Sequence, residues 1–268
     1  MLTTKSIAVF MATKQAKGLS QLTLDSYQYR LGAFARYYRK LPTRPAQIEH
    51  FLAQAGPSQA NRETYYRLFR NFYNVLTKRR MIKANPVLQL DPPRLPRKVA
   101  RSLTLDQLGT LLHHPSHTPQ IRAFLWLLAD TGIRLSEALS ITAGSINGHI
   151  TLVDGKTGQR EVPISPRVGR MVLDALPWPW ASYQAAGLAV RRAFRQADLI
   201  GSRMSAHALR HTFCRQWTGD ETLLQGIMGW TSLRMLRTYR PYVLERAIAQ
   251  HRECGPLSHI TSQLPLVV

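Results

Sequence analysis

Three segments in the second half of the chain bring together groups that could act on a phosphate ester. Arg134 follows the sequence D-T-G-I, His207 and Arg210 lie three residues apart in H-A-L-R-H-T-F, and Tyr239 ends the segment M-G-W-T-S-L-R-M-L-R-T-Y. Guanidinium groups are planar forks that pair with phosphate oxygens through charge-assisted hydrogen bonds. A phenol, protonated at neutral pH, needs a base such as imidazole before it can attack phosphorus. This combination is typical of phosphoryl transfer to a tyrosine oxygen.

The order, spacing and wording of these segments resemble the tyrosine recombinase family, of the phage-integrase type with two domains as in Xer and Cre proteins. By this resemblance the catalytic residues are Arg134, Lys156, His207, Arg210, Trp230 and Tyr239. The resemblance implies a site-specific recombinase or integrase that cleaves and rejoins DNA strands through a 3′-phosphotyrosyl intermediate, with Tyr239 as the nucleophile. It also implies a helical DNA-clamping domain ahead of the catalytic domain.

The chemistry of each group supports a role in that reaction. Arg134 and Arg210 would neutralise the charge that develops on the non-bridging oxygens, and His207 would accept the proton of Tyr239. The resemblance assigns Lys156 to protonation of the departing 5′ oxygen. No set of carboxylates or histidines suited to a divalent ion accompanies these residues, so we expect no metal and no other cofactor. Because the phosphotyrosyl ester keeps the energy of the broken bond, rejoining needs no ATP.

Trp230 departs from the usual family pattern, and the hairpin offers a second cation beside Lys156. Most members have histidine where this chain has Trp230, although some carry tryptophan, and the nine-residue interval to Tyr239 is the usual one. An indole N–H can donate to a phosphate but cannot transfer a proton. The segment D-G-K-T-G-Q-R-E-V-P-I resembles the family's hairpin sequence and favours Lys156 as the hairpin cation, with Arg160 as the alternative.

Other side chains near these motifs have structural interpretations. We expect Glu137 to orient the turn at Arg134 or to cap its helix, without a catalytic role. Tyr242 is the nearest rival nucleophile, but the spacing of the motif favours Tyr239 and leaves Tyr242 for packing. Cys214 is expected to be a small buried side chain.

The overall charge points to a polyanionic partner. The 268 residues include 36 Lys and Arg against 15 Asp and Glu, a formal net charge of +21, which favours double-stranded DNA over a small acidic substrate. The longest apolar stretch, residues 124–129, is too short to span a membrane, and the N-terminal segment is interpreted as a helix rather than a leader. We expect a cytoplasmic, nucleoid-associated protein of prokaryotic or mobile-element origin.

The elements that must position these groups are predicted to be mainly α-helical. Residues 3–77 show apolar and aromatic residues at helical spacing, with basic residues between them. Four prolines between Asn85 and Arg101 exclude a regular helix there. We therefore predict an N-terminal helical core-binding (SAM-like) domain at 1–84, a linker at 85–101, an α-rich catalytic domain with a small three-stranded antiparallel sheet at 102–255, and a C-terminal tail at 256–268.

Local signals predict how the catalytic domain presents its motifs. Thr104 and Gln107 have capping-box spacing, Gly132 can end a helix in the left-handed conformation, and Ser136 can begin the next one. This arrangement puts Arg134 in a turn between helices. The only convincing strand region, 146–164, puts Lys156 on a hairpin turn.

The assembly and two rival functions complete the expectations. The family resemblance implies a homo-oligomer on DNA, with four protomers in the synapse, and the apolar end of the tail could dock on a neighbouring protomer. A type IB topoisomerase-like enzyme would relax supercoils without exchanging sites. A catalytically inactive DNA-binding accessory protein would bind DNA without forming a covalent adduct.

Overall fold

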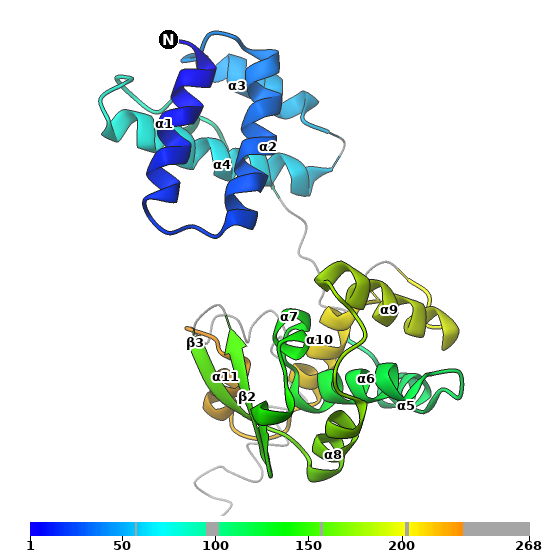
Figure 1. The fold of residues 1–268 in the computed structure, drawn as a ribbon. Helices are drawn as coiled ribbons and strands as arrows, with labels where there is room; N and C mark the ends of the chain where they lie inside the picture. The colour runs from blue at the N-terminus through cyan, green and yellow to red at the C-terminus, as the bar shows by residue number, and fades with distance from the viewer. Residues whose placement is uncertain (57, 95–101, 156–157, 202–203, 233–268) are drawn as a thin grey trace, which may run out of the picture. The chain divides into compact units, whose positions relative to one another are not determined.

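The computed structural model describes residues 1–56, 58–94, 102–155, 158–201 and 204–232. The chain divides into two compact units, Met1–Lys98 and Val99–Val268, which are drawn in Figure 1. None of the described helices is long and apolar enough to cross a membrane.

The first unit is built from four helices around an aromatic core. They are α1 (Thr3–Gln15), α2 (Gln21–Tyr37), α3 (Pro45–Gln54) and α4 (Gln59–Lys78). Phe10, Phe34, Phe69 and Phe72 are fully buried between them, and edge-to-face ring contacts such as Phe10 with Phe72 fix their packing. The prediction of successive helices from residue 3 is confirmed.

The segment after α4 differs from the predicted linker. A short 3₁₀ helix, η1 (Pro86–Gln89), begins where the Asn85 side chain accepts a hydrogen bond from the Val87 amide. Val87 and Leu90 are buried in the core of the first unit. The sequence predicts a linker from residue 85 because prolines exclude an α-helix, but they do not prevent apolar side chains from packing on a neighbouring domain.

The second unit begins with three helices, α5 (Leu105–His113), α6 (Pro119–Thr131) and α7 (Leu135–Leu139). Thr104 and Gln107 form the predicted capping box at the start of α5. Helix α6 is apolar around most of its circumference, because α5, α7, α8, α9 and α10 all contact it. It therefore lies against α7, which follows Arg134, and against α10, which carries His207 and Arg210.

A small antiparallel sheet follows α7 and the 3₁₀ helix η2 (Ala143–Ser145). Its strands are β1 (Ile146–Asn147), β2 (Ile150–Gly155) and β3 (Gly158–Pro163), in the order β1-β2-β3. The buried Val153 and Val162 point to the core, and the exposed residues alternate with them as a two-residue period requires. The register pairs Gly155 with Gly158 at the end of the β2–β3 hairpin.

Four more helices complete the described part of this unit: α8 (Pro166–Ala175), α9 (Tyr183–Gln196), α10 (Ala206–Gln216) and α11 (Glu221–Met228). In Figure 1 the sheet and α11 lie on one side of α6, and α11 contacts β3. The prediction of a mainly helical chain with one three-stranded antiparallel sheet is confirmed.

Candidate active site

The turn that carries Arg134 is fixed by its own sequence. Gly132 ends α6 in the left-handed conformation (φ 62°), as predicted, and Arg134 is the N-cap of α7. The Arg134 backbone amide donates to Glu137 Oε2 at 2.7 Å, and its Nη1 donates to Glu137 Oε1 at 2.7 Å. The prediction that Ser136 begins the helix is wrong, because Glu137 satisfies the amide of Arg134 and the helix starts at Leu135. The orienting role predicted for Glu137 is confirmed.

Glu137 also binds a second arginine, from the hairpin. Arg160 on β3 donates through Nη1 and Nη2 to both carboxylate oxygens of Glu137, each at 3.0 Å. Burial alone would raise the pKa of Glu137, but the hydrogen bonds from Arg160 and Arg134 outweigh it and lower the pKa to about 2. Arg160 Nε donates to the Ile227 carbonyl at 3.0 Å. Arg160 therefore joins the hairpin to α7 and to the end of α11.

Arg210 is held on α10 at the wall of a cavity. It is only 2% exposed, and its guanidinium donates to the Gly132 carbonyl at 2.8 Å and to the Met228 carbonyl at 2.9 Å. These bonds reach the residue that ends α6 and the last residue of α11. They fix the plane of the guanidinium while the side chain still lines the cavity.

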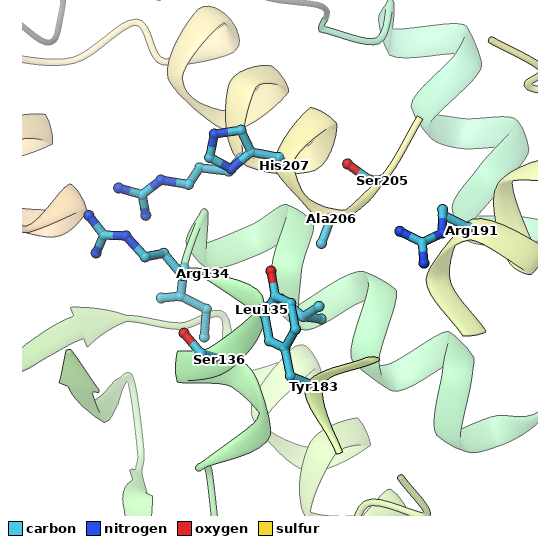
Figure 2. A pocket seen from close by; sticks show the side chains of 10 residues that line it. Arg134, Leu135, Ser136, Tyr183, Arg191, Ser205, Ala206 and His207 are labelled. Carbon is cyan, nitrogen blue, oxygen red and sulfur yellow. The ribbon is translucent and has the colours of Figure 1, made fainter. Parts of the chain in front are cut away.

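His207 lies one turn before Arg210 and lines the same cavity, as does Arg134. Burial lowers the pKa of His207 below its ordinary value of 6.5, and the positive charges of Arg210 and Arg134 lower it further. Figure 2 shows His207 and Arg134 on the same side of the cavity. The imidazole is therefore neutral at physiological pH, which is the state that a general base requires.

Trp230 follows the left-handed Gly229 that ends α11. It is 7% exposed and packs in a small cluster with Cys214, Leu224 and Met228. The guanidinium carbon of Arg210 lies 6.0 Å from the centre of a Trp230 ring. Trp230 is not among the described residues that line the cavity, so its connection to the cavity runs through Arg210. The burial predicted for Cys214 is confirmed.

Two predicted catalytic residues lie outside the described residues. Lys156 follows the last residue of β2, and Tyr239 comes seven residues after the last described residue, Ser232. Of the six predicted catalytic residues, the structure brings Arg134, His207 and Arg210 together around one cavity.

Three polar residues that the sequence motifs do not include also line this cavity: Tyr183, Arg191 and Ser205. The first two lie on α9, whose sequence resembles none of the motifs. Their spacing of eight residues puts them on one face of the helix, but nothing local indicates which neighbour that face would meet. Within the described ranges, no group of three or more His, Cys, Asp or Glu side chains could hold a metal ion.

Relatives of known identity match most of the chain. XerD from Shewanella oneidensis is 26% identical, covering 90% of this chain and 93% of its own length. XerD from Xanthomonas campestris is 28% identical, covering 83% of each protein. Both are named tyrosine recombinases, and no family model matches the chain. Over most of its length the chain is similar to tyrosine recombinases.

Solved structures agree with this recombinase fold. A lambda integrase dimer (residues 75–356) bound to a COC′ core site superposes with a TM-score of 0.75 at 18% identity, covering 90% of this chain and 95% of that one. A lambda integrase tetramer bound to a Holliday junction gives a TM-score of 0.72, also at 18% identity, covering 87% and 78%. At this identity the likeness concerns the fold.

Proposed function

We propose that this chain is a tyrosine recombinase that cleaves and rejoins DNA at specific sites through a 3′-phosphotyrosyl bond to Tyr239. The observation that carries the proposal is the single cavity shared by Arg134, Arg210 and a neutral His207. Two guanidinium forks on one wall match a phosphodiester whose non-bridging oxygens gain charge during attack. Elements far apart in the sequence hold these groups in place: the turn after α6, strand β3, α10 and the end of α11. Arginines on an ordinary solvated surface are not held in this way.

The cleavage step can be written from these groups. The phenol oxygen of Tyr239 forms a bond to phosphorus as the bond from phosphorus to the 5′ oxygen breaks. The phenol proton moves to His207, and Lys156 supplies a proton to the departing oxygen. A 5′ hydroxyl from a second strand reverses these events, so the number of phosphoester bonds is conserved. Arginines neutralise the phosphate, and the mechanism requires neither metal nor ATP.

Trp230 supports this mechanism through Arg210. Its buried ring packs close to the guanidinium and covers one side of it. Shielding from water strengthens the attraction between the guanidinium and a bound phosphate.

The assembly on DNA follows the same reasoning. Lambda integrase forms a dimer on a core site and a tetramer on a Holliday junction. We propose that this chain acts as a tetramer on two sites, on the DNA of a bacterial cell or mobile element, with residues 256–268 docking on a neighbouring protomer. Deleting those residues should weaken pairing of two sites more than binding to one, and unchanged pairing would contradict the role of the tail.

Covalent trapping tests the chemistry with no target sequence chosen in advance. Wild-type protein is incubated with a pool of random-sequence duplexes that contain nicks, and the DNA that stays attached after denaturation is recovered and sequenced. We expect attached DNA with wild type and none with Tyr239→Phe. Because Tyr183 lines the cavity and Tyr242 is the nearest rival in sequence, Tyr183→Phe and Tyr242→Phe serve as comparisons that should still form the adduct.

The outcomes separate the competing functions. An adduct that persists in Tyr239→Phe and disappears in Tyr183→Phe would assign the nucleophile to α9 and overturn this mechanism. DNA binding without any adduct would identify an inactive accessory protein. An adduct accompanied by relaxation of supercoiled DNA, with no exchange between two copies of the recovered site, would favour a topoisomerase.

A further inference from the structure

The cavity at the active site is larger than one phosphate group needs. Its volume is about 300 Å³, which is room for on the order of ten water molecules. Beyond Arg134, His207 and Arg210 it extends to Tyr183, Ser205 and Arg191. Figure 2 shows Arg191 across the cavity from Arg134 and His207, with the Tyr183 hydroxyl pointing into the space between them.

The charge of the wall also exceeds what one phosphodiester would balance. Arg134, Arg210 and Arg191 all line the cavity, and no Asp or Glu is among the described residues that do so. A phosphodiester carries a single negative charge, whereas three guanidiniums carry three positive ones. No ion pair to a described carboxylate is formed by Arg191, whose side chain is exposed on α9.

Helix α9 presents these groups on one face. Tyr183, Gly187 and Arg191 are spaced four residues apart and therefore lie in one row along the helix. In the middle of the row, a Cβ built on Gly187 would be 3.5 Å from Leu135 of α7, so this face packs toward the helix that Arg134 caps. Tyr183 is 56% exposed, so its ring is not a core packing residue, and its hydroxyl remains available to an occupant of the cavity.

We propose that Arg191 and Tyr183 form a second phosphate subsite, which holds a backbone phosphate next to the scissile one on the same DNA strand. This inference rests on the proposed function, since it takes Arg134, His207 and Arg210 as the site of the scissile phosphate. Phosphates of one strand recur every 3.4 Å along the duplex axis, so the phosphate next to the scissile one is close enough for the same cavity to hold it. The second subsite fixes the register of the strand, and so which phosphate meets the nucleophile.

The test maps individual phosphates in the presence of the full chain. The protein carries Tyr239→Phe to prevent cleavage, and the probe is a duplex recovered from a random-sequence pool by repeated gel-shift selection with that protein. Backbone phosphates are replaced one at a time by uncharged methylphosphonates, and each dissociation constant is measured. We expect that one replacement beside the scissile position weakens binding about tenfold, as loss of a charge-assisted hydrogen bond does.

Arg191→Ala and a matched control decide the assignment. In Arg191→Ala the unmodified duplex should bind about tenfold more weakly, and the sensitive methylphosphonate should have no further effect. Arg192→Ala also removes an exposed charge from the same helix, but Arg192 is not among the described residues that line the cavity. That variant should keep the sensitivity of the parent protein.

The results distinguish the subsite from the chemistry. If every methylphosphonate effect persists undiminished in Arg191→Ala, the second subsite does not exist. Because the measurement needs no cleavage, it remains informative if wild type never forms a covalent adduct. In that case the absence of an adduct contradicts the proposed function. The subsite is still supported if one methylphosphonate that weakens binding of the parent protein no longer does so in Arg191→Ala.

Discussion

Neutralising Glu137 should lower both the stability of the second unit and the rate of adduct formation. The Glu137 side chain is only 2% exposed and receives hydrogen bonds from Arg160, from the Arg134 backbone and from the Arg134 side chain. Its pKa falls from the ordinary value of 4.5 to about 2. This difference corresponds to about 3 kcal/mol of stability at neutral pH, within the range observed when buried ion pairs are broken.

The largest single contribution to the lowered pKa of Glu137 comes from Arg160. The Arg160 side chain is well buried and binds both carboxylate oxygens, whereas that of Arg134 is 37% exposed and its contribution is screened by solvent. Glu137→Gln leaves Arg160 without its counter-charge and weakens the anchor of Arg134. We expect the free energy of unfolding of the second unit to drop by about 3 kcal/mol, and its melting temperature by roughly 10 °C.

The dependence on pH tests the electrostatic origin of this loss. A carboxylate with a lowered pKa stabilises the folded state above its unfolded pKa, and this contribution is lost as the pH falls toward the folded value. Wild type and Glu137→Gln should therefore differ by a constant amount above about pH 5. The difference should shrink by about 2 kcal/mol by about pH 3. Urea unfolding measured at intervals across this range, from neutral to acidic pH, gives this curve directly.

The control is Glu161→Gln, which removes the same charge from an exposed position on β3. We expect it to change stability by less than about 0.5 kcal/mol. In the trapping assay Glu137→Gln should lower the rate of adduct formation by about 100-fold, because Arg134 loses its fixed position. A Glu137→Gln penalty below about 1 kcal/mol at neutral pH, or one that does not change with pH, would refute the account of this ion cluster.

Three further predictions concern the groups around the cavity. Gly132→Ala would put a Cβ 2.5 Å from Phe213 Cδ1 at a positive φ, and it should lower the free energy of chemical unfolding by more than about 2 kcal/mol. Gly148 also has a positive φ but lies in open space, so Gly148→Ala should lower it by only about 1 kcal/mol. The lowered pKa of His207 predicts that kcat/KM for adduct formation rises with pH with a midpoint below 6.5; an acid limb that survives in His207→Ala would contradict its role as base. Arg210→Lys cannot bridge two carbonyls and should destabilise the second unit by about 2–4 kcal/mol in the same unfolding assay, so stability equal to wild type would show that those bonds are dispensable.

The sequence predicts those parts of the site that depend on local chain geometry. The left-handed Gly132, the turn at Arg134 and the orienting contact of Glu137 all fall within six residues, where turn and capping chemistry leave few alternatives. The one-turn spacing of His207 and Arg210 on a helix also follows from the sequence. The start of the linker does not, because it depends on burial of Val87 and Leu90 by residues far earlier in the chain.

Arg160 shows why the remaining contacts could not be predicted. Its partners are Glu137, 23 residues earlier, and the carbonyl of Ile227, 67 residues later. The sequence leaves Arg160 as an alternative hairpin cation, since nothing local distinguishes an exposed arginine from one that is bound. His or Lys at that position would also have matched a basic hairpin. His has only two ring N–H donors, and Lys has all three of its donors on one nitrogen, so neither reproduces the planar fork through which Arg160 meets both carboxylate oxygens and the carbonyl. Three-way bonding of this kind follows from tertiary structure alone.

The bonds of Arg160 and Arg210 have one consequence in common, because both end on the last turn of α11. Arg160 binds the Ile227 carbonyl and Arg210 the Met228 carbonyl, which are among the carbonyls that a helix leaves without internal partners. Gly229 then turns the chain, and Trp230 is held by a hydrogen bond from its amide to the Gln225 carbonyl. Tyr239 comes nine residues after Trp230, so the chain that leads to the proposed nucleophile departs from a point set by Arg210, which lines the cavity, and by Arg160, which holds the Glu137 that orients Arg134. Substitution of either arginine therefore changes both the phosphate site and the origin of the nucleophile's segment, and their effects on cleavage should not be additive.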